Sequence, residues 1–163
     1  MSGEITESVY IETTIPSLYT GRPSSQLVEA ARQQLTHNWW DLERDNYQIV
    51  TSQTVIDECA RGEKLMADKR VKFLEGIPLL RLTDDVALIA KELLAAQIIP
   101  MKAADDAIHI AVASVHEIDY LLTWNCKHLA NPKIWWRVSD VVTKFGYKPS
   151  VICTPEDLIG DDC

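Results

Sequence analysis

The sequence lacks the features that would place the chain in a membrane or stabilise it with disulfide bonds. No apolar run approaches the ~20 residues that a membrane-spanning helix requires. The four cysteines form no Cys-x-x-Cys pair, and no secretory signal precedes the first apolar element. We therefore expect reduced thiols, no metal bound by thiolates, no membrane association and a cytoplasmic location.

Repeats, low-complexity segments and flexible linkers are also absent, and neither a Ser-His-Asp arrangement nor a phosphate-binding glycine loop is recognisable. Hydrophobic residues make up 47% of the 163 residues and charged residues 25%, which is ordinary globular composition. This length and composition predict one domain over residues 1–163, with its core at about 8–158, large enough to fold without disulfide bonds.

Basic residues are few, at 16 against 24 acidic ones, and the formal net charge is −8. Such a surface repels phosphate backbones, so strong non-specific binding of nucleic acid is excluded. A divalent cation held by acidic side chains would still bring a phosphate group to this protein. A solvated acidic surface accounts for most of the charges.

Short β-branched runs alternate with longer segments of helical periodicity. Strands are predicted at residues 8–12, 47–51, 78–82, 120–123 and 151–153. Helices are predicted at residues 24–44, 53–61, 63–75, 83–97, 104–116 and 133–145. This alternation implies right-handed βαβ crossovers. We therefore expect an α/β fold, a three-layer αβα sandwich with a central, mainly parallel sheet of four to five strands.

Local signals refine the first part of this pattern. A turn is predicted from Thr13 to Pro16, because a proline disfavours helix at the preceding residue. Ser24 or Ser25 is expected to cap the next helix. The apolar stripe of that helix is predicted to contain Leu27, Val28, Ala31, Leu35 and Trp39.

Polar side chains follow the predicted strands, where parallel α/β sheets bind ligands. Glu12 ends the first strand, and Glu58 lies in the helix after the second. Asp105 and Asp106 open the helix at residues 104–116, and Asn125 follows the strand predicted at residues 120–123. Oxygen ligands of this kind suit Mg²⁺ or Mn²⁺. Two such ions can activate water and stabilise the leaving oxygen of a phosphoryl displacement.

Each of these positions also has a purely structural explanation. Asp105 or Asp106 can cap a helix, Glu58 can be a solvated helical residue, and Asn125 is a common turn residue. Glu12 is harder to explain, because an acidic side chain at the end of a central strand is costly without a partner. The metal-site hypothesis therefore rests on the set of residues.

Four segments, in this order along the chain, resemble the PIN-domain family of ribonucleases, and in particular the VapC-like toxins. They are Tyr-Ile-Glu-Thr-Thr-Ile-Pro-Ser at 10–17, Asp-Ala-Ile-His-Ile-Ala-Val-Ala at 106–113, Leu-Leu-Thr-Trp-Asn-Cys-Lys-His-Leu at 121–129 and Ile-Cys-Thr-Pro-Glu-Asp-Leu at 152–158. The resemblance implies a PIN-like fold and an endoribonuclease that cleaves RNA with Mg²⁺ or Mn²⁺. It also implies a toxin that is neutralised by an antitoxin protein, and a homodimer.

The resemblance also assigns roles to individual residues. Glu12, Glu58 and Asp106 match the metal-binding acidic residues, and Asn125 matches the fourth member of the catalytic set. Supporting roles fall on Thr14, Asp105 and Thr123.

Two of these positions depart from the family pattern. The family usually has aspartate where this chain has Glu12 and Asn125, and a neutral amide binds metal only through its carbonyl oxygen. The alternative is therefore a catalytically weak or inactive module that binds RNA or a protein partner. A metal-dependent phosphatase ranks last, because the first strand is not followed by an Asp-x-Asp pair.

Other residues have two readings each. His109 is either a ligand near the site or, more commonly for a helical histidine, hydrogen-bonded beside the core; His128 is similar. The pairs Trp39–Trp40 and Trp135–Trp136 provide either stacking platforms for bases or, more commonly, packing and interface area. The candidates for contact with substrate phosphate are Arg22, Lys102 and Lys127.

Overall fold

A computed structural model of the protein describes residues 6–159. Its sheet is built of five strands: β1 (Ser8–Ile11), β2 (Gln48–Ser52), β3 (Leu79–Leu80), β4 (Tyr120–Leu122) and β5 (Val151–Cys153). Their order is β3-β2-β1-β4-β5, and every pairing is parallel. The predicted α/β class and parallel sheet are confirmed, and β1 lies at the centre.

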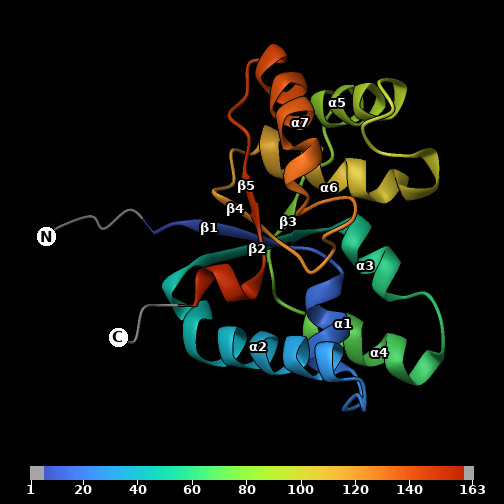
Figure 1. Ribbon diagram of the computed structural model, residues 1–163, viewed down its shortest axis with the longest axis vertical. Coiled ribbons are helices and arrows are strands. Elements are labelled where there is room, and N and C mark those ends of the chain that lie inside the picture. The colour runs from blue at the N-terminus through green and yellow to red at the C-terminus, as the bar shows by residue number, and fades with distance from the viewer. Residues whose placement is uncertain (1–5, 160–163) are drawn as a thin grey trace, which may run out of the picture.

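Helices cover both faces of the sheet (Figure 1). The α-helices are α1 (Thr14–Thr20), α2 (Leu27–Glu43), α3 (Gln53–Cys59), α4 (Lys64–Phe73), α5 (Asp84–Ala95), α6 (Ala104–Val115) and α7 (Pro132–Lys144). Short 3-10 helices are η1 (Arg44–Asn46), η2 (Met101–Ala103) and η3 (Pro155–Leu158). Figure 1 shows α5, α6 and α7 in one layer and α1, α2 and α4 in the other. This is the three-layer arrangement that the sequence predicts.

The alternating side chains of β1 supply both hydrophobic cores. Val9 and Ile11 pack in the cluster that contains Trp39 and Trp40 of α2. Tyr10 points to the other face and packs in the cluster that includes α5 and α6. Strand β1 is therefore buried on both faces, as expected for the middle of a parallel sheet.

Helix α6 follows its predicted pattern closely. Ala107, Ile110, Ala111 and Ser114, all on the predicted apolar face, are buried. The helix carries Asp105 and Asp106 in its first turn, yet its N-cap residue is an alanine whose side chain makes no capping hydrogen bond. Because α6 packs extensively against α5 and lies next to β4, its N-terminal turn is fixed at the carboxyl edge of the sheet.

The turn predicted from Thr13 to Pro16 is wrong, because helix α1 begins there. Pro16 is the third residue of α1, where backbone N–H groups have no partner within the helix, so the proline removes no hydrogen bond. Ile15 and Pro16 are buried, and this burial favours the helix. Helix α1 thus starts almost directly after Glu12.

The predicted start of the next helix is also wrong. Helix α2 has Gln26 as its N-cap residue, and no side chain makes a capping hydrogen bond there. Ser24 instead accepts a hydrogen bond from the backbone of Gln26 through its hydroxyl and donates one to Glu29. It therefore stabilises the loop before α2, and neither Ser24 nor Ser25 caps the helix.

The buried face of α2 differs from the predicted stripe at its N-terminal end. Leu27 and Val28 are 86% and 66% exposed, whereas Trp39 is fully buried. The buried polar residues Gln33 and Thr36 lie on this face instead. The hydrophobic pattern is misleading here because the first turn of α2 extends beyond the edge of the core.

The other elements lie near their predicted positions, although β3 is shorter than the predicted strand at residues 78–82. Thr83 caps α5 by accepting a hydrogen bond from the backbone of Val86, as expected.

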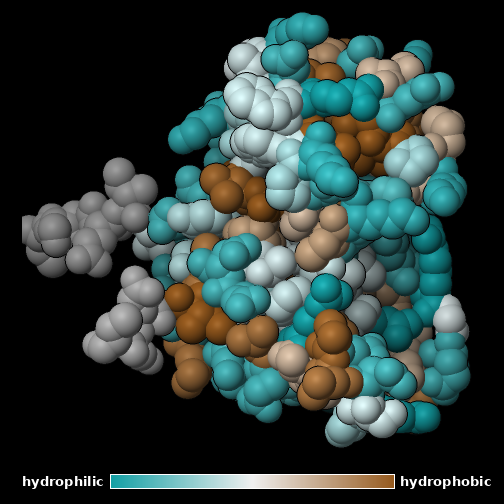
Figure 2. All heavy atoms as spheres, viewed as in Figure 1, coloured by the Kyte–Doolittle hydropathy of each residue, from teal (hydrophilic) through white to brown (hydrophobic). Residues whose placement is uncertain are grey.

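No helix among residues 6–159 combines the length and apolar character needed to span a membrane. Figure 2 shows hydrophilic residues on this face of the molecule interspersed with separate hydrophobic patches.

The cysteines of the described chain carry free thiols, as expected. Cys59 and Cys153 are buried and Cys126 is exposed, while Cys163 lies outside the described residues. Burial raises the pKa of both the Cys59 and the Cys153 thiol to about 12, so neither is a reactive thiolate at neutral pH.

Candidate functional site

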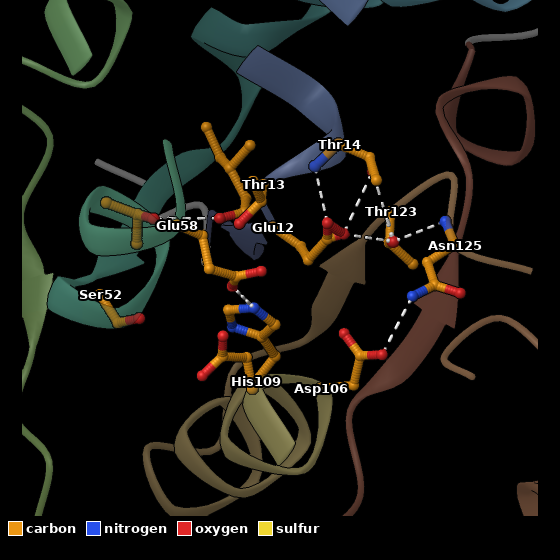
Figure 3. A network of polar contacts seen from close by, with 12 residues as sticks. Glu12, Thr13, Thr14, Ser52, Glu58, Asp106, His109, Thr123 and Asn125 are labelled. Atoms are coloured by element: carbon orange, nitrogen blue, oxygen red, sulfur yellow. Dashed lines mark hydrogen bonds and ion pairs between the residues drawn. The ribbon is translucent and has the colours of Figure 1, made fainter. Parts of the chain in front are cut away.

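The predicted acidic residues come from different elements and lie at the carboxyl edge of the sheet (Figure 3). Glu12 follows β1, Glu58 lies in α3 directly after β2, and Asp106 lies in the first turn of α6. Asn125 follows β4. Because β1, β2 and β4 are adjacent and parallel, their carboxyl ends meet at this edge.

Glu12 is held by a dense set of hydrogen bonds. The backbone N–H of Thr14 donates to Oε1 at 2.6 Å, and the hydroxyls of Thr14 and Thr123 donate to Oε2 at 3.1 and 2.7 Å. Only 3% of Glu12 is exposed. Thr14 and Thr123 therefore fix the orientation of this carboxylate, and burial leaves it little solvent to stabilise its charge.

Glu58 is joined to the core through a histidine. Nε2 of His109 lies 2.5 Å from Oε1 of Glu58, and the side chain of His109 is fully buried. Nδ1 of the same ring lies 2.8 Å from the hydroxyl of Tyr10, which in turn lies 2.7 Å from the hydroxyl of Ser52. His109 is thus hydrogen-bonded beside the core, the second of its two readings.

Asn125 is held by hydrogen bonds through both polar atoms of its side chain. Its Nδ2 donates to Oδ2 of Asp106 at 3.2 Å, and its Oδ1 accepts from the backbone N–H of His128 at 3.0 Å. The carbonyl oxygen through which an amide would bind a cation thus has one of its two lone pairs in use. In this arrangement, Asn125 orients the carboxylate of Asp106.

Asp105 lies apart from this network. Its Oδ2 pairs with Arg61 at 3.1 Å, and both side chains are partly exposed. No hydrogen bond among the described residues joins Asp105 to the other carboxylates, although Asp105 lines the same cavity as Glu58 and Asp106. Successive residues of a helix point in different directions, which explains why Asp105 and Asp106 have different partners.

A cavity of about 420 Å³ opens beside the carboxylates. Its lining includes the acidic residues Glu58, Asp105 and Asp106 together with Arg61, Lys102 and His128. Of the three candidates for phosphate contact, only Lys102 lines this cavity. The cavity therefore places positive side chains next to carboxylates in an otherwise acidic protein.

The electrostatics of the site centre on the ring of His109. Burial raises the pKa of Glu12 and of Asp106, and the charge on His109 partly offsets this for both. Burial also acts to raise the pKa of Glu58, but the hydrogen bond and charge of His109 outweigh it, so this pKa lies below its ordinary value. Burial lowers the pKa of His109, yet the surrounding carboxylates raise it overall.

Oxygen donors of the kind that Mg²⁺ and Mn²⁺ prefer are present, but they are not gathered around one point. Among residues 6–159, no three acidic, histidine or cysteine side chains lie close enough together to hold one metal ion. Glu12, Glu58 and Asp106 each have a hydrogen-bonded protein partner instead. The donor set thus fits these cations in chemical type, whereas its present spacing suits a hydrogen-bonded network.

Thr13 is a site residue that the sequence analysis missed. Its hydroxyl oxygen is buried and has no well-formed hydrogen bond to any described residue. It nevertheless lies near enough to Glu58 to lower the pKa of that carboxyl group. Tyr10 and Ser52 were missed as well, because Tyr10 is an ordinary core residue by pattern and Ser52 reads as a strand end. Only the tertiary contact with His109 reveals their polar role.

The two tryptophan pairs differ in their environments. Trp39 and Trp40 are buried in the core, which excludes them as stacking platforms. Trp135 and Trp136 line a cavity of about 520 Å³ between α7 and β5, and Trp136 is 78% exposed.

No protein-family model matches this chain, and no curated protein matches its sequence. Among solved structures, it is similar to a crystal structure of VapBC2 from Rickettsia felis bound to a DNA fragment from their promoter. The TM-score is 0.58 and the identity 14%, over 90% of this chain and 97% of the matched chain. The similarity therefore extends over nearly the whole of both chains, and at this identity it concerns the fold.

Proposed function

We propose that this protein is a metal-dependent endoribonuclease of the VapC-like PIN type. The observation that carries the proposal is that Glu12, Glu58 and Asp106, from three separate elements, lie at one edge of a parallel sheet and act electrostatically on the same buried histidine. The similarity of the fold to a chain of a VapBC complex supports it. Hydrolysis of RNA phosphodiester bonds is the proposed reaction.

The proposed metal ligands are Glu12, Glu58 and Asp106, directly or through water, with Mg²⁺ or Mn²⁺ as the cation. When bound, such a cation supplies Lewis-acid activation of water and of the phosphate. The residues around it have separate tasks. Thr14 and Thr123 hold Glu12, His109 holds Glu58, and Asn125 holds Asp106.

Substrate binding is assigned to the neighbouring cavity. Lys102 lines it, so its charge can offset the repulsion between an RNA phosphate and the carboxylates, whereas Arg61 is already paired with Asp105. Asn125 keeps Asp106 turned toward this edge. Together, these residues would orient one phosphodiester beside the carboxylate set.

The proposed cellular role follows from the fold similarity. The similar structure is VapBC2 bound to a DNA fragment from their promoter, and we propose that this chain is a cytoplasmic toxin that pairs with an antitoxin protein and forms a homodimer. Co-expression of the chain with and without the protein encoded next to it, with cell growth and complex formation as readouts, tests this role. Equal growth in both cultures would contradict it.

The nuclease proposal is tested by comparing two first-turn aspartates. Purified wild-type protein should cleave single-stranded RNA with Mn²⁺, and Asp106→Asn should abolish cleavage. Asp84→Asn is the matched control, because Asp84 also lies in the first turn of a helix, α5, but is exposed and away from the site. Cleavage that survives Asp106→Asn, or that falls equally in both variants, would contradict the proposal.

A second candidate function has its own supporting observation. All three carboxylates are hydrogen-bonded to protein groups, and Asn125 replaces the usual acidic residue, which favours a module that binds RNA or protein without cleaving it. Calorimetric titration with Mn²⁺ discriminates between the two. Binding near micromolar concentration supports the enzyme, and absence of binding at millimolar concentration supports the module.

A further inference from the structure

We infer that Tyr10 and Ser52 are positioning residues of the candidate site, although neither belongs to the carboxylate set. They act through the ring of His109, which contacts Glu58 directly. The inference rests on the proposed function, because Glu58 is one of the proposed metal ligands. It adds a buried hydrogen-bonded chain to the residues on which that function depends.

The chain of contacts is short and closed to solvent. It runs from Ser52 Oγ to Tyr10 Oη at 2.7 Å, and from Tyr10 Oη to His109 Nδ1 at 2.8 Å. It ends with the 2.5 Å contact between His109 Nε2 and Glu58 Oε1. Ser52, Tyr10 and His109 are all fully buried.

The direction of the hydrogen bond to Glu58 follows from the chemistry of the two groups. An ionised carboxylate only accepts hydrogen bonds, so His109 must donate to Glu58 from Nε2. Nδ1 meets the hydroxyl of Tyr10 in either state of the ring, because a charged ring donates from Nδ1 and a neutral one accepts there. The Tyr10 hydroxyl also shares a hydrogen bond with the hydroxyl of Ser52.

This arrangement fixes the orientation of the His109 ring. A ring flip would break its hydrogen bonds to Tyr10 and Glu58 in a buried environment. The fixed ring in turn holds Oε1 of Glu58, while no hydrogen bond from the described residues reaches Oε2. Glu58 is thereby oriented to offer Oε2 to a cation.

Removal of the Tyr10 hydroxyl would leave the packing of the ring unchanged but release Nδ1. The ring would then keep only its hydrogen bond to Glu58, so its orientation in the buried site would be held less firmly. Outer partners of metal ligands typically contribute about 10- to 100-fold to metal affinity. We therefore expect Tyr10→Phe to weaken Mn²⁺ binding by about 10-fold or more.

The first experiment tests the positioning directly, without activity or metal. In ¹⁵N-histidine-labelled protein, His109 should be protonated at Nε2, with its signals assigned by their loss in His109→Gln. In Tyr10→Phe, the Nδ1 signal should shift, because that nitrogen loses its hydrogen bond to the Tyr10 hydroxyl. Unchanged His109 signals in Tyr10→Phe would overturn the inference.

The second experiment measures Mn²⁺ affinity by calorimetry, with thermal unfolding of each variant recorded in parallel. Tyr120→Phe is the matched control, because the Tyr120 hydroxyl bonds to Glu7 at the opposite edge of the sheet. Weaker Mn²⁺ binding in Tyr10→Phe and Ser52→Ala, but not in Tyr120→Phe, supports positioning. Lower thermal stability with wild-type Mn²⁺ affinity would show a purely structural role and overturn the inference.

Two substitutions of His109 separate the contribution of its Nε2 atom from that of its Nδ1 atom. A glutamine places an amide N–H near the position of Nε2, whereas an asparagine places it near Nδ1. His109→Gln should therefore retain more Mn²⁺ affinity than His109→Asn, and equal losses would contradict the inference. If the wild-type protein binds no Mn²⁺, the proposed function fails, and the ¹⁵N comparison still decides whether Tyr10 fixes the ring that holds Glu58.

Discussion

Both ends of the sheet carry acidic side chains, but only the carboxyl end buries them. At the amino end, Asp119 and Glu7 are exposed, and Asp119 accepts hydrogen bonds from the backbone N–H and the hydroxyl of Ser8. At the carboxyl end, Glu12 is 3% exposed and its pKa is raised by burial. The acidic residues at the amino end join neighbouring strands by hydrogen bonds and, being exposed, lose little hydration. The acidic residues at the carboxyl end are buried, which costs desolvation free energy.

Under the proposed function, this difference separates structural from functional carboxylates. A solvated carboxylate at a strand end is explained by the hydrogen bonds that it accepts. The burial of Glu12 is only partly offset by its hydrogen bonds and by His109, so its pKa stays raised, as is common for functional groups. Matched substitutions at the two ends therefore test the interpretation.

The largest difference is expected in RNA cleavage. Glu12→Gln should reduce Mn²⁺-dependent cleavage by at least about 100-fold, about 3 kcal/mol in activation free energy, because the proposed metal loses a charged ligand. Asp119→Asn, at the other end, should leave the rate within about 2-fold. Single-turnover cleavage of a labelled RNA measures both, and equal effects would erase the distinction between the two ends.

Stabilisation by Mn²⁺ should be nearly as large. A ligand at 100 times its dissociation constant adds about 2.7 kcal/mol to the free energy of unfolding. We expect this increase in the wild-type protein and in Asp119→Asn, but not in Glu12→Gln. Urea unfolding with and without Mn²⁺ provides the measurement, and an equal increase in Glu12→Gln would place the cation elsewhere.

A smaller effect is expected when pH is varied without divalent cations. Burial raises the pKa of Glu12 above the ordinary 4.5, so the folded state binds this proton more tightly than the unfolded state. Stability is then lost as pH rises from 4.5 through the raised value. The pKa of His109 lies above 6.5 because its carboxylate partners outweigh burial, so its contribution is also lost as pH rises through that higher value.

Both groups predict a lower free energy of unfolding at pH 8 than at pH 5.5. Glu58 acts in the opposite direction, but only at lower pH, because its lowered pKa gives stability that is lost as pH falls below 4.5. Glu12→Gln should reduce the difference between pH 5.5 and pH 8. Urea titrations at the two pH values measure it, and greater stability at pH 8 would contradict the electrostatic account.

The smallest effect is expected at the amino end. Asp119→Ala removes the acceptor of two hydrogen bonds from Ser8, at an exposed position, so a loss of about 1 kcal/mol is expected. The loss should be independent of Mn²⁺. Thermal unfolding in both conditions checks this, and a loss that depends on Mn²⁺ would extend the functional region across the sheet.

Local patterns were sufficient to predict the elements that form the sheet edge. The small and apolar residues of α6 predict its buried face, and the alternation of strands and helices predicts parallel pairing. Pattern also predicts that Glu12, Glu58 and Asp106 share an edge, because each follows or adjoins a strand. Their spacing could not be predicted, since it depends on which hydrogen-bond partners each carboxylate finds in the folded chain.

The errors have physical causes as well. Pro16 suggests a turn, but in the first turn of α1 it costs no hydrogen bond. Leu27 and Val28 suggest a buried stripe, but the core ends before them. The contact between Tyr10 and His109 joins positions 99 apart in the chain, so no local pattern reveals it.

The alternation of β1 has a consequence for how this protein can vary. Tyr10 and Glu12 point to the α6 side, while Val9 and Ile11 fill the opposite layer. An insertion or deletion of one residue within this strand would reverse which face each side chain points to. The Glu12 carboxylate and the Tyr10 hydroxyl would then enter the hydrophobic cluster on the opposite face. We therefore expect β1 to accept substitutions but not insertions or deletions. Changes in chain length should be tolerated only in the loops.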